Sequence, residues 1–335
     1  MVNKKTRWLA AAGFVVAVLA GATASARGQV HVDPTASIQG AAEHISFGDS
    51  AYVGPFASIS ARQPLRIGDR SSIRDNTTIR AIAAPVTLGA KAIVAHGAAV
   101  IARLNHPVRI GVYGACPGDA PACPAFVGFN ARVEGIVEKD AMVLSLARVG
   151  PGVRIPSGRK VLAGANVTRQ EEVEEKTAPV VEADRLFMDS MVEVNAVLAR
   201  ISGRGDGQVP AEGSVPTDGS KTGQEAAGTI AEMSGYVSFH APGGCSLELG
   251  DGGIYGFHSV VHGGPTNFPR NDGNFTVTGR FLRLGDESVL YRSRVGDNVT
   301  IGYRSVVEQS DLPSGTVIGD RVVIIGNVQV GRVEW

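Results

Sequence analysis

Aliphatic residues recur at every sixth position along most of this chain. The longest unbroken run is Val137, Val143, Val149, Ile155, Val161 and Val167, and shorter runs include Ile67, Ile73 and Ile79, then Leu88, Val94 and Val100, then Val295, Ile301 and Val307. A period of six matches neither an amphipathic α-helix nor the simple alternation of a β-strand. It is typical of a chain that turns a corner after each short strand and points one aliphatic side chain inward from each side of a triangular prism. The pattern predicts a mainly β protein, a left-handed parallel β-helix of hexapeptide repeats.

The repeat occurs in two blocks, separated by segments of different character. We expect the first block at 27–178 and a second, shorter block at 235–335. Between them, apolar residues with the 4-3-4-3 spacing of an amphipathic helix predict one α-helix at 179–202; these residues are Phe187, Met191, Val194, Leu198 and Ile201. Residues 203–234 are rich in Gly, Ser, Asp and Thr, which is typical of a flexible linker.

The first 26 residues have the three parts of an export signal. Lys4, Lys5 and Arg7 precede an apolar stretch, and Ala24-Ser25-Ala26 is a cleavage site of small residues. We therefore expect a signal peptide at 1–26 and an exported, periplasmic or extracellular protein, with no membrane segment after cleavage. Because 32 basic and 32 acidic residues balance and no run of Lys and Arg occurs, the composition indicates no nucleic-acid partner.

Two of the three cysteines lie close together in the sequence. Cys116 and Cys123 bracket a short loop with two prolines and a glycine, whereas Cys245 stands alone. In an oxidising compartment such a close pair predicts a disulfide. Two cysteines cannot make a structural zinc site without further ligands nearby, so the pair favours a disulfide over a metal site.

Several segments of the first block resemble the γ-class carbonic anhydrases. The similar segments include Val32-Asp33-Pro34-Thr35-Ala36-Ser37-Ile38, Ile67-Gly68-Asp69-Arg70-Ser71-Ser72-Ile73-Arg74-Asp75, Ala95-His96 and Ile155-Pro156-Ser157-Gly158-Arg159. The resemblance covers about 30–200. It implies a left-handed β-helix followed by a helix, a homotrimer, and a zinc ion held by three histidines, two from one subunit and one from its neighbour.

Most residues of the implied zinc site are replaced in this chain. The resemblance places ligands at Arg80, His96 and Ile101, of which only His96 is a histidine. The arginine that partners Asp75 in the family is Ser60 here, and the family's glutamine beside that aspartate is Arg74. A cation at a vacant ligand position repels zinc, so we expect a dismantled catalytic site in the first block alone.

The second block can be aligned with the first as a duplicate. In that alignment His262 takes the position of Arg80, and Arg292 takes the position of His96. If the two blocks pack side by side, His96 and His262 could face one cleft and form a composite zinc site. A third ligand would then have to come from His258 or His106, neither of which occupies a family position.

Three functions follow from these observations. The favoured hypothesis is an exported, non-catalytic, trimeric scaffold or binding module, which needs no cofactor and whose ligand the sequence does not reveal. The second is a zinc-dependent carbonic anhydrase, hydrating carbon dioxide at the composite site. The third is a hexapeptide-repeat acyltransferase with His96 or His106 as the base.

Overall fold

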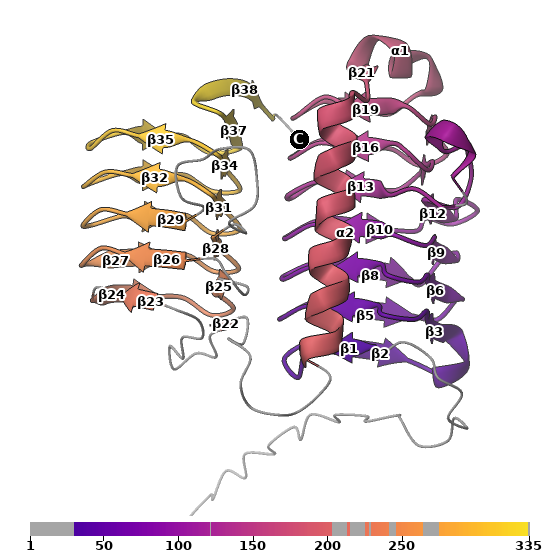
Figure 1. The fold of residues 1–335 in the computed structure, drawn as a ribbon, viewed down its shortest axis with the longest axis horizontal. Helices are drawn as coiled ribbons and strands as arrows, with labels where there is room; N and C mark the ends of the chain where they lie inside the picture. The colour runs from indigo at the N-terminus through magenta and orange to yellow at the C-terminus, as the bar shows by residue number, and fades with distance from the viewer. Residues whose placement is uncertain are drawn as a thin grey trace, which may run out of the picture.

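The computed structural model describes residues 30–120, 122–202, 213–214, 225–227, 229–240, 246–263 and 275–333. The predicted signal peptide and Cys245 lie outside these residues. Figure 1 shows two stacks of coils standing side by side, with one long helix against the first stack. We call the stacks the first solenoid (β1 to β21) and the second solenoid (β22 to β38). Among the described residues, no helix is long and apolar enough to cross a membrane.

The first solenoid has three sheets, A, B and C, one on each side of a prism, and within each sheet successive coils pair in parallel. Sheet A contains β1 (His31–Val32), β4 (Tyr52–Val53), β7 (Ser72–Ile73), β10 (Ala92–Val94), β13 (Ala125–Val127), β16 (Met142–Val143), β19 (Arg159–Val161) and the antiparallel β21 (Thr177–Pro179). Sheet B contains β2 (Ser37–Gly40), β5 (Ser58–Ala61), β8 (Thr78–Ala81), β11 (Ala99–Ile101), β14 (Arg132–Val133), β17 (Arg148–Val149) and β20 (Asn166–Val167). Sheet C contains β3 (Ile45–Phe47), β6 (Leu65–Ile67), β9 (Val86–Leu88), β12 (Val108–Ile110), β15 (Ile136–Val137) and β18 (Arg154–Ile155).

The long helix α2 (Glu182–Ser202) lies where the apolar 4-3-4-3 stripe predicts it. It packs on β1, β4 and β10, so it covers sheet A. Shorter helical segments are η1 (Ala42–His44), η2 (Pro117–Asp119), η3 (Gln170–Glu172) and α1 (Val173–Lys176). The predicted disulfide between Cys116 and Cys123 is confirmed and closes the loop that contains η2.

The second solenoid repeats this plan with three sheets, named here A′, B′ and C′ after their counterparts in the first. Sheet A′ contains β24 (Ile230–Met233), β27 (Gly253–Tyr255), β30 (Arg283–Leu284), β33 (Thr300–Ile301) and β36 (Val317–Ile318). Sheet B′ contains β22 (Gly213–Ser214), β25 (Ser238–His240), β28 (Val260–His262), β31 (Val289–Tyr291), β34 (Val306–Glu308), β37 (Val322–Ile325) and β38 (Val328–Arg332). Sheet C′ contains β23 (Glu225–Ala227), β26 (Ser246–Leu249), β29 (Phe275–Thr278), β32 (Arg294–Val295) and β35 (Asp311–Leu312). Its strands therefore begin before residue 235, inside the stretch expected to be linker.

The aliphatic residues of the six-residue pattern form the interiors of the two prisms. Ile73, Ile79, Val94 and Val100 are fully buried in the core of the first solenoid, and the second solenoid has a separate core around Val261 and its neighbours in adjacent coils. The parallel stacking confirms the predicted β-solenoid. Because each coil pairs its backbone with the next coil, the two cores are continuous columns.

A third apolar cluster joins the two solenoids, and we call it the seam. From the first solenoid and α2 it contains Ile93, Phe126, Phe129, Met142, Leu146 and Met188, and from sheet B′ it contains Val260, Val289, Tyr291, Val306 and Val323. Sheet B′ therefore packs against sheet A. Beside the seam, the Asn76 amide donates to the carbonyl oxygens of Tyr236 and His258, each at 3.2 Å, and the Asn130 amide donates to that of Glu287 at 2.7 Å.

The register of the strands corrects one part of the internal alignment. His262 pairs with Tyr291 in sheet B′ as Arg80 pairs with Ile101 in sheet B. Tyr291 is thus the counterpart of Ile101, and Asp286 is the counterpart of His96. The assignment of Arg292 to the position of His96 is wrong. The alignment omitted β29, which forms one side of the prism between Tyr255 and Leu284, and so it was displaced by one side from there on.

Candidate functional site

A small, partly open cavity lies in the seam, between sheet A, α2 and sheet B′. Its lining includes His96 and Phe129 from the first solenoid, Met191 and Asn195 from α2, and His262 and Tyr291 from the second solenoid. The cavity measures about 30 Å³, which is roughly the volume that one water molecule occupies in the liquid. It is the place where the sequence predicted a cleft shared by the two blocks.

The structure brings His96 and His262 together in this cavity. Their ring centroids are 5.0 Å apart with an interplanar angle of 62°, and the two residues are 3% and 5% exposed. The His96 ring also stacks on Phe129, at a centroid distance of 5.7 Å. His96 lies two residues after β10, at the corner toward sheet B. His262 is the last residue of β28 and points out of its own prism.

Arg74 occupies the space beside the two imidazoles. Its guanidinium lies 3.4 Å from Nε2 of His262 and donates to Oδ1 of Asn195 at 2.9 Å. The Asn195 amide in turn donates to the Ser72 hydroxyl at 2.7 Å. A guanidinium has donors only, so in this contact Nε2 of His262 is the acceptor.

Asp75 connects the corner of the first solenoid to the second solenoid. Its Oδ1 lies 3.5 Å from Nδ1 of His96, and its Oδ2 accepts a hydrogen bond from the Ser238 hydroxyl. Asp75 is fully buried. At the position where the resembled family has an arginine near this aspartate, the chain has Ser60. The hydrogen bond to Asp75 comes instead from Ser238 of the second solenoid.

These residues do not fit a catalytic zinc ion. Such an ion needs three protein ligands and an open position for water. The Nε2 lone pair of His262 faces a guanidinium, whose positive charge opposes a second cation in the same cavity. Among the residues that the structure describes, no group of three or more His, Cys, Asp or Glu side chains could hold a metal ion.

The other candidate ligands lie away from the cavity. His106 is exposed in the turn between β11 and β12, next to Arg103. His258 stacks on Phe257 at 4.1 Å, and burial lowers its pKa below the ordinary value. Arg80 lies on the outer face of sheet B, paired in register with Ser60 on one side and Ile101 on the other.

Sequence reasoning missed three residues of the site. Asn195 lies on the apolar stripe of α2, four residues after Met191, and a polar residue inside such a stripe was the available signal. Ser238 and Tyr291 gave no comparable signal, since serines and tyrosines at outward positions of a coil are ordinary surface residues.

A buried carboxyl group lies near the same seam, where Ser145 donates a hydrogen bond to Glu308. Burial raises the pKa of Glu308 to about 7, against an ordinary 4.5, despite that hydrogen bond. The folded protein therefore favours the protonated acid. Stability from this group is fully present below pH 4.5 and is lost as the pH rises through 7.

We expect Glu308→Gln to remove this pH dependence. The unfolding free energy of the wild type should fall by about 3 kcal/mol between pH 4.5 and 8, and that of the variant should stay level by comparison. Urea denaturation at several pH values measures the difference. Ser145→Ala serves as the control: it keeps the carboxyl group and removes the hydrogen bond that lowers its pKa, so its pH dependence should be at least as steep as that of the wild type. A variant with the wild-type slope would show that Glu308 is not the group responsible.

Comparison with known proteins finds a weak similarity to a carbonic anhydrase. No protein-family model matches the chain. A carbonic anhydrase from Methanosarcina thermophila is 27% identical over 179 residues, which cover 50% of this chain and 70% of that protein. The weak similarity to a carbonic anhydrase and the solenoid of stacked parallel coils fit a carbonic anhydrase-like left-handed β-helix family.

Proposed function

We propose that this chain is an exported, non-catalytic, carbonic anhydrase-like scaffold or binding module that assembles as a homotrimer. The observation that carries the proposal is the position of the Arg74 guanidinium, 3.4 Å from Nε2 of His262. In the family resembled, a zinc ion lies between subunits. Here the space between two solenoids of one chain is filled by hydrogen bonds among Arg74, His262 and Asn195. The disulfide is compatible with export.

The cavity supports a structural role for these residues. It has room for about one water molecule, and the rings of Phe126, Phe129 and Phe187 form part of its lining. A zinc enzyme needs a path for its substrate and an acidified water on the metal. A small pocket that already contains a guanidinium is poorly suited to either.

A composite zinc enzyme is the second candidate, and one observation favours it. The 5.0 Å separation of the His96 and His262 rings is compatible with two ligands of one ion. That enzyme would require Arg74 to move away. It would also require a third ligand from outside the described part of this chain, since His106 and His258 do not line the cavity.

Metal analysis of the purified mature protein separates the two candidates. We expect much less than one zinc per chain and carbon dioxide hydration at the uncatalysed rate, because one accessible imidazole cannot hold a catalytic zinc. His96→Ala and His262→Ala should leave both values unchanged. Arg74→Gln removes the cation but adds no third ligand, so it should also remain free of zinc. About one zinc per chain, lost in each histidine variant, would instead establish the composite enzyme.

A further inference from the structure

The outer face of sheet C carries a straight row of arginines. Arg66, Arg109 and Arg154 occupy the same outward position on β6, β12 and β18. Thr87 and Ile136 lie between them in the strand register. Neighbouring strands of a sheet are about 4.8 Å apart, so successive arginines lie about 10 Å apart along the solenoid. These residues are far apart in the sequence, and no run of basic residues indicates the row.

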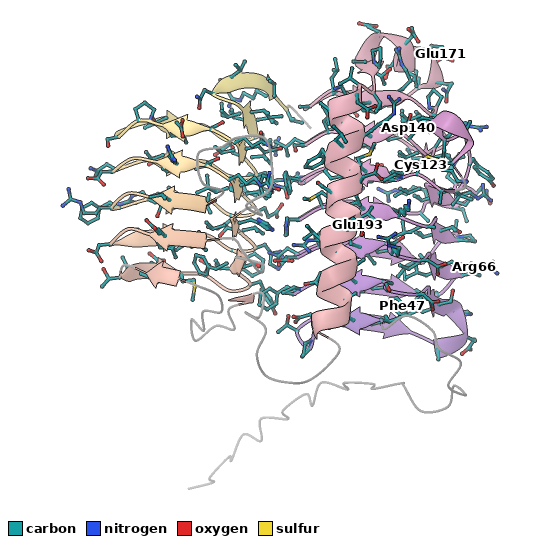
Figure 2. The ribbon with its side chains drawn as sticks, viewed as in Figure 1. Phe47, Arg66, Cys123, Asp140, Glu171 and Glu193 are labelled. Carbon is teal, nitrogen blue, oxygen red and sulfur yellow. A yellow bond between two sulfur atoms is a disulfide. The ribbon has the colours of Figure 1, made fainter. Side chains whose placement is uncertain are left out.

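The row is accessible and lies on the side of the first solenoid that faces away from the second. Figure 1 shows the strands of sheet C along this outer edge, and Figure 2 shows Arg66 there. Arg66 and Arg154 are exposed and Arg109 is partly exposed. Because α2 and the second solenoid both pack on sheet A, neither of them covers this face.

The row has an excess of positive charge. The six strands of sheet C contain these three arginines and no acidic residue. Glu138, at the next corner, accepts a hydrogen bond from Arg154 and also accepts the backbone N–H of Ser157 at 3.0 Å. In the part of the chain that the structure describes, no carboxylate pairs with Arg66 or Arg109. Two guanidiniums of the row therefore have no counter-charge within the chain.

A tyrosine ring lies beside the row. Tyr113 is 41% exposed, and the guanidinium carbons of Arg109 and Arg154 lie 5.5 and 5.9 Å from the centre of its ring. The backbone N–H of Lys139 donates to the Tyr113 carbonyl at 2.8 Å and fixes the ring over this coil. The ring limits the freedom of both arginine side chains, which lowers the entropic cost of binding a partner, and it adds an aromatic surface.

The spacing of the arginines indicates the kind of partner. Arginine binds carboxylates and sulfates in pairs of hydrogen bonds. A nucleic-acid strand carries a phosphate about every 3.4 Å, far more densely than the row. An anionic membrane surface attracts clusters of basic residues rather than a single file. A sugar ring is about as long as one strand spacing, so a polysaccharide with an acidic group on every second sugar matches the row, and its rings can pack on Tyr113.

We propose that the sheet C row binds a linear acidic polysaccharide, which lies along the solenoid axis with its carboxylate or sulfate groups on Arg66, Arg109 and Arg154. The proposal deepens the proposed function and rests on it, since it names the class of ligand that the binding module takes. The contact surface includes neither the seam nor its cavity.

Fluorescence anisotropy with the mature protein tests the proposal. The probes are labelled hyaluronan, with a carboxylate on every second sugar, and chondroitin sulfate, which adds a sulfate. The double variant Arg66→Glu with Arg109→Glu should weaken binding about tenfold or more, and added salt should weaken the binding of the wild type. Arg283→Glu with Arg332→Glu is the matched control, because it makes the same net charge change on exposed residues of the second solenoid. This control should bind like the wild type, and both double variants should keep the thermal unfolding profile.

Competing probes decide the class of partner. Neutral dextran, poly-L-glutamate, duplex DNA and phosphatidylglycerol vesicles should each bind more weakly than the two acidic polysaccharides. Tighter binding of any of these four, no binding of either polysaccharide, or equal binding by the two double variants overturns the proposal.

These outcomes are distinct from those of the zinc measurement. A zinc-free protein that binds neither polysaccharide would overturn this inference alone. A zinc-loaded, active enzyme would overturn the proposed function, whereas the arginine row would stand or fall by the binding measurement.

Discussion

Replacing Val289 with aspartate is expected to separate the two solenoids. Val289 is 1% exposed and lies in the middle of the seam, between Val260 and Val306 in the register of sheet B′. A carboxylate at this position has no partner to balance its charge, and burying it costs about 3 kcal/mol or more. The folded solenoids can avoid that cost by moving apart, because each has a core of its own.

Two measurements on this variant distinguish undocking from unfolding. Small-angle scattering should show a larger radius of gyration, and circular dichroism should retain the β signal of both solenoids. Val328→Asp is the control, since Val328 is 59% exposed on β38 of the same solenoid and the same change there should alter neither. A Val289→Asp protein with wild-type dimensions and stability would mean that the seam does not hold the solenoids together.

Replacing Glu134 with glutamine is expected to have the second largest effect. Glu134 is fully buried, and its carboxylate lies among the guanidiniums of Arg103, Arg132 and Arg148, each within 2.9 Å. The neutral amide leaves three positive charges facing one another without a counter-charge. The arginines are partly exposed, so solvent screens part of this repulsion, and we expect a loss of about 2–4 kcal/mol of unfolding free energy.

The pH dependence of stability gives an independent check on Glu134. Burial alone would raise the pKa of Glu134, but the hydrogen bonds from the three arginines outweigh it and lower that pKa to about 2, against an ordinary 4.5. Stability from this group is therefore present above pH 4.5 and is lost as the pH falls toward 2. Denaturation curves over this range should be steeper in pH for the wild type than for Glu134→Gln. Glu175→Gln, an exposed site, should follow the wild type.

The interior of both solenoids could be read from the amino-acid sequence alone. In every coil, one aliphatic residue in six points inward. The spacing of Val137, Val143 and Val149 therefore predicts three sides of one prism without any long-range information. The helix was equally readable, since the apolar stripe before residue 202 has its own period. The loop disulfide depended on two cysteines only seven positions apart.

The seam and the site within it were decided by tertiary structure. Arg74 and His262 are 188 positions apart, and both point out of their prisms, where no period constrains the residue type. Counting repeats placed His262 correctly but misplaced Arg292, because the count lost one side of the prism between Tyr255 and Leu284. The environment of an outward residue depends on what packs against it. Arg80 faces solvent, whereas its counterpart His262 is buried, although both lie at the same position of the repeat. Repetition determines the coil, whereas only the docking of one coil stack on another determines which outward side chains meet.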